Sequence, residues 1–404
     1  MITAAAAILL LLHRHRQHQR QDQRSIPIKT TTQPHTTRKV LSTTSALLVT
    51  ILGLGGASIG DLYLKIPNEQ AMQTLLTAHA QQITFYDTSP WYGVGLSEAR
   101  FGLALHTVDR SSFVLQTKVG RYLVPDRQCV NGTNVGWIGG YHFNIVFDYT
   151  AAGFQRQMED SLQRMGLGYV DSLVIHDLEP TPRIGTQEEK THLALQDLLQ
   201  LEASGYEYLV KARQAGTIRA FGAGCNSNEA GEDWVLKRQW NQNYVKRLIS
   251  LHQKIGKIDF LLLANMFSLL NFEAYEDGIL DQCLQHGIAV VIGGPYSSGI
   301  LATGADPSNG SVPYYNYEHA TDQMRERCRR VEKVCLSYDV PLIAAAIQFP
   351  LLHAAVVSVI PGGKNAWEVR SNVKSMNVTI PVAMWHALQK EDLLPKDFVL
   401  PAEV

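Results

Sequence analysis

The chain has 404 residues, of which 45% are hydrophobic and 18% charged, and its formal net charge at pH 7 is −1. This composition is typical of a soluble globular protein, and the length is compatible with a single large barrel domain. Because the net charge is so small, nothing in the composition indicates binding to nucleic acid or to a membrane surface.

The charge is unevenly distributed along the chain. The chain has 36 basic and 37 acidic residues, and residues 1–60 contain seven of the basic residues and one of the acidic residues. The remainder therefore has 29 basic and 36 acidic residues, a net charge of −7. The five cysteines are scattered and odd in number, which indicates reduced thiols in an intracellular protein.

Residues 1–37 are expected to form an extension outside the fold. Their apolar stretch, residues 2–12, is too short to cross a bilayer as a helix, and the basic cluster follows it instead of preceding it as in a secretory signal. The Ser/Thr-rich, acid-poor continuation fits a disordered tail, an organelle presequence or a mis-assigned start codon. We expect a cytoplasmic protein, with the mitochondrion as the alternative location.

Eight short apolar segments recur along the rest of the chain, after a predicted hairpin that begins at Arg38 and is expected to plug one end of a barrel. Their continuous apolar character predicts strands buried on both faces, as in a parallel sheet covered by helices. The expected strands span residues 47–56, 83–87, 113–118, 171–176, 218–224, 259–265, 288–293 and 355–360.

Helix-like segments lie between these strands. Regular alternation of strand and helix with eight strands favours the α/β class, and within it a closed (β/α)8 TIM barrel over residues 38–404. The expected helices span residues 68–80, 96–105, 154–165, 206–215, 277–286 and 322–338.

An open dinucleotide-binding sheet is the competing interpretation. The first strand does end in glycines (GLGGASIG), but Ser58 stands where the third glycine of G-x-G-x-x-G belongs, and no suitably placed acid follows the second strand. The glycines are expected instead to let the backbone approach a ligand at the barrel mouth. The chain has no zinc-ligand spacing, Walker motif or nucleophile elbow, so we expect no metal site.

Three of the expected strands end in an ionisable residue: Asp87, Lys118 and His176. Strand ends of this kind meet at the catalytic mouth of a barrel, and Tyr92 follows Asp87 closely enough to reach the same mouth. Taken singly, each residue has an ordinary structural explanation, as a turn, a solvated strand end, a structural pair or a packing aromatic. Their joint placement favours a site, because buried charges are costly.

These residue types suit hydride transfer to or from a nicotinamide, which requires a partner that moves the proton of the substrate oxygen. A neighbouring ammonium favours the phenolate, so Lys118 is expected to bring the pKa of Tyr92 closer to working pH. Asp87 would hold Lys118 in place and charged, and His176 would form a hydrogen bond with the substrate oxygen.

The segment FYDTSPWYGVGLSEARFG resembles the signature of the aldo-keto reductases, especially the branch of D-threo-aldose (L-fucose), D-arabinose and L-galactose 1-dehydrogenases and pyridoxal dehydrogenase. VLQTKVGR and SLVIHD resemble the strands that carry the lysine and histidine of that family. The resemblance runs from about Arg38 to the end of the chain. It implies that Tyr92 is the proton donor or acceptor, supported by Lys118, Asp87 and His176.

The resemblance also implies NAD or NADP as cofactor. Asn226 stands where the family contacts the nicotinamide carboxamide, and Phe267 stands near the aromatic that stacks on it, or else packs in the core. Glu368 would repel the extra phosphate of NADP, so we expect NAD. The other expected cofactor residues are Ser297, Ser298 and Gly299 at the pyrophosphate, and Gly362, Gly363, Lys364 and Asn372 at the adenosine.

The connection over residues 121–149 is long and rich in Gly, Asn and aromatics. Long loops on the catalytic face of a barrel usually shape the substrate pocket. Trp137 is therefore expected to form an apolar wall for a sugar ring together with Trp91 and Tyr63. The alternative is an insertion that contacts nothing.

The leading functional hypothesis is an NAD(P)-dependent aldose 1-dehydrogenase that oxidises the anomeric carbon of a sugar to a lactone, with Tyr92 as general base. An NADPH-dependent reductase of aldehydes or ketones would use the same residues in reverse. A non-catalytic, cofactor-sensing regulatory subunit is the third alternative. We expect a small sugar or aldehyde substrate and a monomer or homodimer.

Overall fold

The computed structural model describes residues 34–128, 137–180, 186–227 and 234–401. The expected extension of residues 1–37 therefore lies outside the described residues except for its last four, which include a short 3-10 turn over Pro34–Thr36. Within the described ranges, no helix is both long and apolar enough to cross a membrane.

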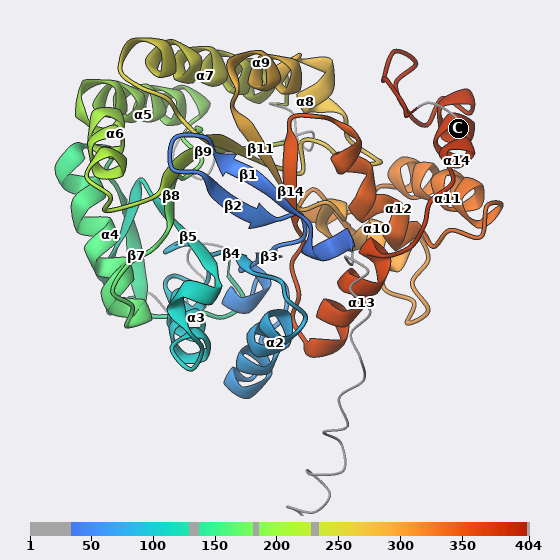
Figure 1. Ribbon diagram of the computed structural model, residues 1–404, viewed down its shortest axis with the longest axis horizontal. Coiled ribbons are helices and arrows are strands. Elements are labelled where there is room, and N and C mark those ends of the chain that lie inside the picture. The colour runs from blue at the N-terminus through green and yellow to red at the C-terminus, as the bar shows by residue number, and fades with distance from the viewer. Residues whose placement is uncertain (1–33, 129–136, 181–185, 228–233, 402–404) are drawn as a thin grey trace, which may run out of the picture. The chain divides into compact units, whose positions relative to one another are not determined.

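Eight parallel strands form the barrel at the centre of the fold (Figure 1), which confirms the expected α/β barrel class. The first and last strands meet, because the backbone N–H groups of Gly53 and Gly55 donate hydrogen bonds of 2.9 Å to the carbonyls of Val359 and Pro361. In spatial order the strands are β3 (Leu54–Gly55), β4 (Phe85–Asp87), β5 (Val114–Val119), β8 (Ser172–Ile175), β9 (Ala220–Asn226), β10 (Phe260–Ala264), β11 (Ala289–Gly293) and β14 (Val356–Ile360).

The predicted hairpin is present, but it takes residues that were expected to belong to the first barrel strand. Strand β1 (Arg38–Ser42) pairs antiparallel with β2 (Leu47–Thr50), so the expected strand 47–56 is divided between β2 and the short β3. The apolar run is continuous because both halves are buried, and continuity alone does not show where one strand ends.

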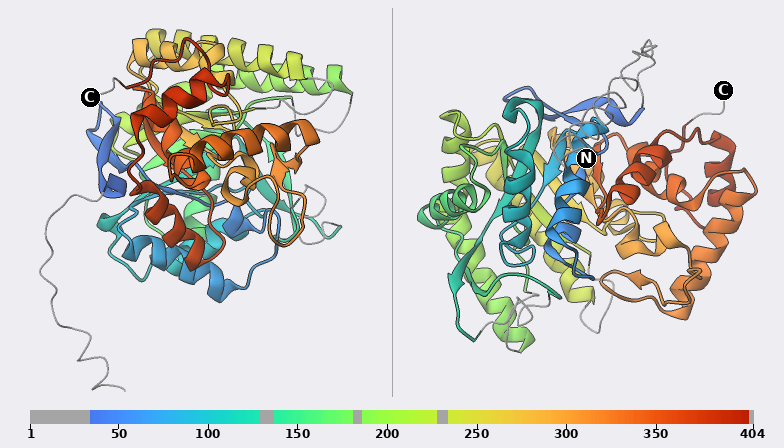
Figure 2. Two further views of the ribbon diagram at one scale, coloured as in Figure 1. Left: turned by 90° about the vertical axis from the view of Figure 1, so that its right-hand side faces the viewer. Right: turned by 90° about the horizontal axis from the view of Figure 1, so that it is seen from below.

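The hairpin closes the amino-terminal end of the barrel, as predicted. Leu41, Leu47 and Val49 belong to one buried cluster with side chains of the barrel strands such as Phe85 and Val291. Figure 1 shows the two strands lying across the barrel, and Figure 2 shows them at the end opposite the ribbon of β6 (Arg121–Pro125) and β7 (Phe143–Phe147). The hairpin therefore covers the bottom of the barrel and leaves the carboxyl ends of the strands for the site.

Helices surround the barrel. All the expected ones are present: α2 (Asn68–Ala80) and α3 (Leu96–Leu105) have the expected ends, whereas one end shifts by one to three residues in α4 (Ala151–Met165), α6 (Tyr206–Gln214), α9 (Ile279–His286) and α11 (Asp322–Leu336). The structure adds helices that the sequence pattern did not predict: α5 (Gln187–Gln200), α7 (Trp234–Lys254), α8 (Glu273–Glu276), α10 (Ile300–Thr303), α12 (Leu342–Gln348), α13 (Ala366–Met376) and α14 (Val382–Lys390).

The glycines after the first barrel strand are required by close protein packing, and the expected ligand approach stays a prediction. A Cβ on Gly56 would lie 2.6 Å from the carbonyl oxygen of Asp87, and one on Gly60 would lie 2.6 Å from the carbonyl carbon of Tyr92. Real Cβ atoms do not approach backbone this closely, so both positions require glycine. These contacts hold the β3–α2 connection against the segment that carries Asp87 and Tyr92.

Candidate active site

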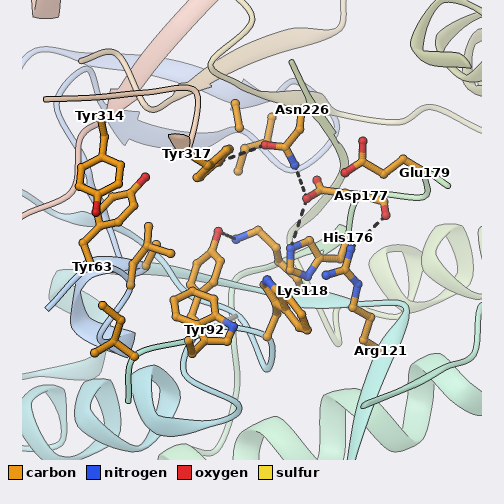
Figure 3. Close-up of a pocket in the computed structure, with 17 residues that line it drawn as sticks. Tyr63, Tyr92, Lys118, Arg121, His176, Asp177, Glu179, Asn226, Tyr314 and Tyr317 are labelled. Carbon is orange, nitrogen blue, oxygen red and sulfur yellow. Dashed lines mark hydrogen bonds and ion pairs between the residues drawn. The ribbon is translucent and has the colours of Figure 1, made fainter. Parts of the chain in front are cut away.

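The three residues expected at the strand ends, Asp87, Lys118 and His176, lie close to Tyr92 (Figure 3, which labels Tyr92, Lys118 and His176). Lys118 Nζ is 2.7 and 2.8 Å from the two carboxylate oxygens of Asp87 and 2.9 Å from Tyr92 Oη. It also donates to the Thr88 carbonyl at 3.0 Å. Lys118 and Asp87 are buried, so this ion pair is shielded from solvent.

The strands explain this arrangement. Asp87 is the last residue of β4 and pairs in register with Gln116 of β5, so Lys118, two residues further along, points to the same side. Gln116 Nε2 donates to Asp87 Oδ1 at 2.7 Å and fixes the carboxylate. The turn after β4, in which Tyr92 N–H donates to Ser89 O at 3.1 Å, brings Tyr92 back over the mouth.

His176 directly follows β8 and faces the same cavity. Its Nδ1 lies 3.1 Å from Ser89 Oγ, which leaves Nε2 as the nitrogen available to a substrate. Burial lowers the pKa of His176 well below its ordinary value, and the positive charges of Arg121 and Lys118 lower it further. His176 is therefore neutral at physiological pH and can donate a hydrogen bond without carrying charge.

The pKa of Tyr92 moves in the direction opposite to the one expected from Lys118 alone. Burial raises it well above the ordinary value, the carboxylates of Asp87 and Asp177 raise it further, and Arg121 opposes them. The charge of Lys118 is balanced by its partner Asp87, so the pair as a whole favours the phenolate little. Tyr92 is thus protonated in this structure.

These residues line a cavity of about 510 Å³, a size that suits a small ligand. Trp91, Tyr63 and Trp137, the expected substrate residues, all line it. The rings of Trp91 and Trp137 meet edge to face at 6.0 Å, and the ring of Trp137 lies 5.8 Å from that of Tyr92. The expected aromatic wall is therefore present beside Tyr92.

The long connection over residues 121–149 contains a two-stranded ribbon, β6 (Arg121–Pro125) paired with β7 (Phe143–Phe147); residues 129–136 lie outside the described part. The guanidinium of Arg121 sits between the rings of Trp91 and Phe147, at 5.1 and 5.3 Å from their centroids. The described part of this connection thus contributes to the cavity instead of standing apart from the protein.

The residues expected at the nicotinamide end have different surroundings. Asn226 lines the cavity, where its amide nitrogen donates to Asp177 and its oxygen accepts from Tyr317 Oη at 3.2 Å. Phe267 instead packs in the core against Phe349, at a centroid distance of 4.9 Å, and is not among the described residues that line the cavity. The core alternative for Phe267 is therefore the one that the structure supports.

The expected pyrophosphate loop follows β11. Ser297 is buried and its hydroxyl lies 2.7 Å from Ser268 Oγ, so this side chain faces the protein. Ser298 accepts a hydrogen bond of 2.9 Å from the Tyr317 N–H. Gly299 has φ +121°, and a Cβ there would meet no atom within 4 Å, so its backbone borders open space.

The expected adenosine residues surround the start of α13. Asn372 Oδ1 accepts from Tyr296 at 2.8 Å, and its Nδ2 donates to Gly362 O at 3.4 Å, which holds the loop carrying Gly362 and Gly363. Glu368 accepts from the Lys364 N–H at 2.9 Å, and its carboxylate lies 3.4 Å from Lys364 Nζ.

Some of the expected residues fit a nicotinamide dinucleotide, and others, such as Phe267 and Ser297, face the protein. Asn226 in the cavity could hold a carboxamide, the open backbone at Gly299 could approach a pyrophosphate, and Lys364 is exposed. The donors and acceptors extend from the catalytic mouth to another loop of the same rim, as an elongated ligand requires.

Several cavity residues were not identified from the sequence: Arg121, Asp177, Glu179, Tyr314 and Tyr317. Asp177 adjoins His176 and was interpreted only as a possible structural partner of it. Tyr314 lies on β12 (Tyr314–Tyr315) and Tyr317 in the turn between β12 and β13 (Glu318–His319), a small ribbon whose position over the mouth depends on tertiary packing.

Comparison with known proteins agrees with this geometry. The model of the Aldo/keto reductase family matches residues 51–392. Pyridoxal 4-dehydrogenase from Microbacterium luteolum is 32% identical over 87% of this chain and 96% of its own length, and D-threo-aldose 1-dehydrogenase from a Pseudomonas species is 30% identical over 87% and 96%. L-galactose dehydrogenase from Arabidopsis thaliana is 23% identical over 82% and 86%.

Solved structures show the same fold. The holo form of an aldo-keto reductase from Bacillus halodurans superimposes with a TM-score of 0.61 at 23% identity, over 87% of this chain and 95% of that one. A glycerol dehydrogenase from Gluconobacter oxydans gives a TM-score of 0.57 at 20% identity, over 88% and 96%. With the family model and the two relatives at 30% identity or more, these findings establish that the chain belongs to the aldo/keto reductase family and is an NAD(P)-dependent oxidoreductase.

Proposed function

We propose that this protein is an aldose 1-dehydrogenase, which oxidises the anomeric carbon of a sugar to a lactone. The observation that carries the proposal is the contact of Tyr92 Oη with Lys118 Nζ, 2.9 Å long, in a cavity that combines aromatic walls with hydrogen-bonding groups such as Asp177 and Arg121. Sugars are bound by this combination of ring stacking and polar contacts. The similarity to D-threo-aldose 1-dehydrogenase and L-galactose dehydrogenase supports the same substrate class.

In this reaction the C1–H bond breaks as a hydride leaves, while the C1 hydroxyl gives up its proton and C1 becomes the lactone carbonyl. Tyr92 receives the proton from the hydroxyl, so it acts as the general base. Because the raised pKa keeps Tyr92 protonated at rest, its own proton must first leave to solvent. The Lys118 ammonium stabilises the phenolate that then accepts the hydroxyl proton, and the neutral His176 donates a hydrogen bond from Nε2 to the same substrate oxygen. The bound nicotinamide supplies the hydride acceptor.

We propose NAD as the preferred cofactor. Glu368 is fixed by its hydrogen bond of 2.9 Å from the Lys364 N–H, and it partly neutralises the one expected phosphate-binding cation, Lys364, at 3.4 Å. A carboxylate held at this position repels the additional phosphate of NADP.

Reduction of aldehydes or ketones is the second candidate. The observation that favours it is the raised pKa of Tyr92, because a protonated tyrosine is the form that donates a proton to a carbonyl oxygen. The NADH-specific methylglyoxal reductase of Escherichia coli, 26% identical over 81% of this chain and 88% of its own length, represents that direction among the relatives. A purely regulatory role is disfavoured because Tyr92, Lys118, Asp87 and His176 form a connected catalytic arrangement.

The test is the formation of reduced nicotinamide with NAD and, separately, NADP, using L-fucose, D-arabinose, L-galactose, D-glucose and pyridoxal as substrates. Oxidation of the sugars, absent in Tyr92→Phe, is the expected result. Failure to oxidise any sugar, combined with reduction of simple aldehydes, would replace the proposal with a carbonyl reductase. Inactivity in both directions, with cofactor binding intact, would favour the regulatory alternative.

A further inference from the structure

The carboxylate of Asp177 lines the cavity but takes no part in the contacts among Tyr92, Lys118 and Asp87. Its Oδ2 lies 3.6 Å from His176 Nε2 and accepts a hydrogen bond from the Asn226 amide (Figure 3). A buried carboxylate beside the reacting groups raises the pKa of Tyr92 and so has an electrostatic cost for a base. A function of the Asp177 carboxylate in substrate recognition would offset this electrostatic cost.

The Asp177 carboxylate occupies the space left by the missing side chain of Gly224 in β9. A Cβ on Gly224 would lie 2.5 Å from Asp177 Oδ1, so the strand accommodates the carboxylate only because this residue has no side chain. The Asn226 amide holds the other oxygen. The carboxylate is therefore seated in one orientation, which is what selective recognition of a substrate group requires.

The seated carboxylate retains capacity to accept hydrogen bonds. Two carboxylate oxygens offer about four acceptor positions. Within the described chain, the Asp177 carboxylate accepts hydrogen bonds from the Asn226 amide and from its own backbone N–H, while Arg121 donates to the Asp177 backbone carbonyl at 3.2 Å. The side chain is 13% exposed, and this exposure faces the cavity.

The location relative to the reacting carbon follows from His176, and this step rests on the proposed function. Ser89 occupies Nδ1, so the reacting oxygen binds at Nε2, and the Asp177 carboxylate stands directly beside that point. In a sugar, the oxygen on the next carbon lies about one hydrogen-bond length from the reacting oxygen. We propose that Asp177 selects substrates that carry a hydroxyl on the carbon adjacent to the reacting carbon, by accepting a hydrogen bond from that hydroxyl.

Selectivity of this kind is strong because it penalises the substrate that lacks the group. When the substrate carries a hydroxyl on the adjacent carbon, this hydroxyl replaces water as the hydrogen-bond donor to the Asp177 carboxylate. With only hydrogen at that carbon, the bound substrate excludes water and leaves a cavity-facing acceptor position of the carboxylate without a donor, although the Asn226 amide still binds Oδ2. Sites built around a buried polar group reject analogues that lack the matching group far better than apolar pockets reject an extra methylene.

The experiment compares kcat/KM for D-arabinose with that for 2-deoxy-D-ribose, its 2-deoxy counterpart, and for L-fucose with that for 2-deoxy-L-fucose. The wild type is expected to prefer the 2-hydroxy sugar about tenfold to a hundredfold, the range for a hydrogen bond to a charged group. Asp177→Ala should bring both ratios near one, and the isosteric Asp177→Asn should give intermediate ratios. Glu179→Gln, which changes another cavity carboxylate, should keep the wild-type ratios.

Two results overturn the inference while leaving the proposed function intact. One is a wild type that oxidises each sugar and its 2-deoxy counterpart equally well. The other is an Asp177→Ala variant that is slower on both but keeps the wild-type ratio, which would make Asp177 only a positioning residue for His176 and Asn226. Absence of any sugar oxidation by the wild type, with aldehydes reduced, would overturn the proposed function and this inference together.

Discussion

Lys118 donates a hydrogen bond of 2.9 Å to the phenolic oxygen of Tyr92, although the two residues come from different strand–loop units and lie 26 positions apart. The same ammonium is bound to both carboxylate oxygens of Asp87. Its charge is therefore available to a phenolate while remaining balanced in the resting state, which suits a tyrosine that releases and recovers a proton.

The pH dependence of sugar oxidation should reflect the raised pKa of Tyr92. Because burial and neighbouring carboxylates raise the pKa of Tyr92, the phenolate is scarce at neutral pH, and kcat/KM for oxidation should keep rising as the pH increases. The lowered pKa of His176 predicts no break near its ordinary value of 6.5. The groups that act on Tyr92 are Asp87, Asp177, Tyr317, Arg121, Lys118 and His176.

A pH–rate profile of the wild type and of Asp177→Asn checks this prediction. Removal of the negative charge of Asp177 should lower the pKa of Tyr92 and move the rising part of the profile to lower pH. Oxidation that is fastest in acid, or a profile unchanged by the substitution, would contradict it.

Removal of Lys118 should damage stability as well as activity. Lys118→Met leaves the Asp87 carboxylate buried without its counter-ion, which typically costs about 3–5 kcal/mol of unfolding free energy. Adding Asp87→Asn should recover much of that stability but none of the turnover, because Tyr92 still lacks the ammonium. Chemical denaturation and steady-state rates on the same preparations measure both effects; a double variant with restored turnover would show that the ion pair is only structural.

The choice of cofactor should depend on Glu368. Replacing it with arginine removes the repulsion and adds a phosphate-binding cation, so Glu368→Arg should shift the ratio of NADP to NAD affinity by about tenfold or more toward NADP. Dissociation constants from the quenching of tryptophan fluorescence report this without turnover. Asp322→Arg, the same charge change at a fully exposed side chain, is the control, and an equal shift in it would rule out a local effect.

The close approach of Gly60 to the catalytic loop should make this position sensitive for activity. Gly60→Ala places a Cβ 2.6 Å from the carbonyl carbon of Tyr92, so the loop must move and turnover should fall at least tenfold. Gly168→Ala, where a Cβ would meet nothing within 4 Å, should leave turnover unchanged. If Gly60→Ala retains wild-type rates while folding normally, the loop position is not what aligns Tyr92.

The sequence predicted which strand-end residues come together and three aromatic residues of the cavity wall, but not the rest of the wall. Asp87, Lys118 and His176 could be placed because strand ends of a barrel meet at one rim whatever the loops do. Tyr317 and Arg121 could not, because they lie on a small turn and on a ribbon strand outside the barrel, whose positions over that rim depend on tertiary packing. A residue type also does not reveal which way its side chain points.

Three further differences have similar origins. Phe267 was a candidate for stacking on the cofactor, yet it lies in the core with Phe349, since an aromatic at the end of a strand can face either side. The boundary between β2 and β3 was hidden by one uninterrupted apolar run. The direction of the Tyr92 pKa shift depended on Asp87 neutralising Lys118 and on burial, neither of which a sequence pattern measures.

The most direct test of the proposed function follows the hydrogen itself. L-fucose and D-arabinose labelled with deuterium at C1 are incubated with NAD and the enzyme, and the reduced nicotinamide and the sugar product are analysed by mass spectrometry. One deuterium in the nicotinamide is expected for each lactone formed, and neither product is expected with Tyr92→Phe. Reduced nicotinamide without deuterium, or lactone formation that persists in Tyr92→Phe, would contradict oxidation of the anomeric carbon at this site.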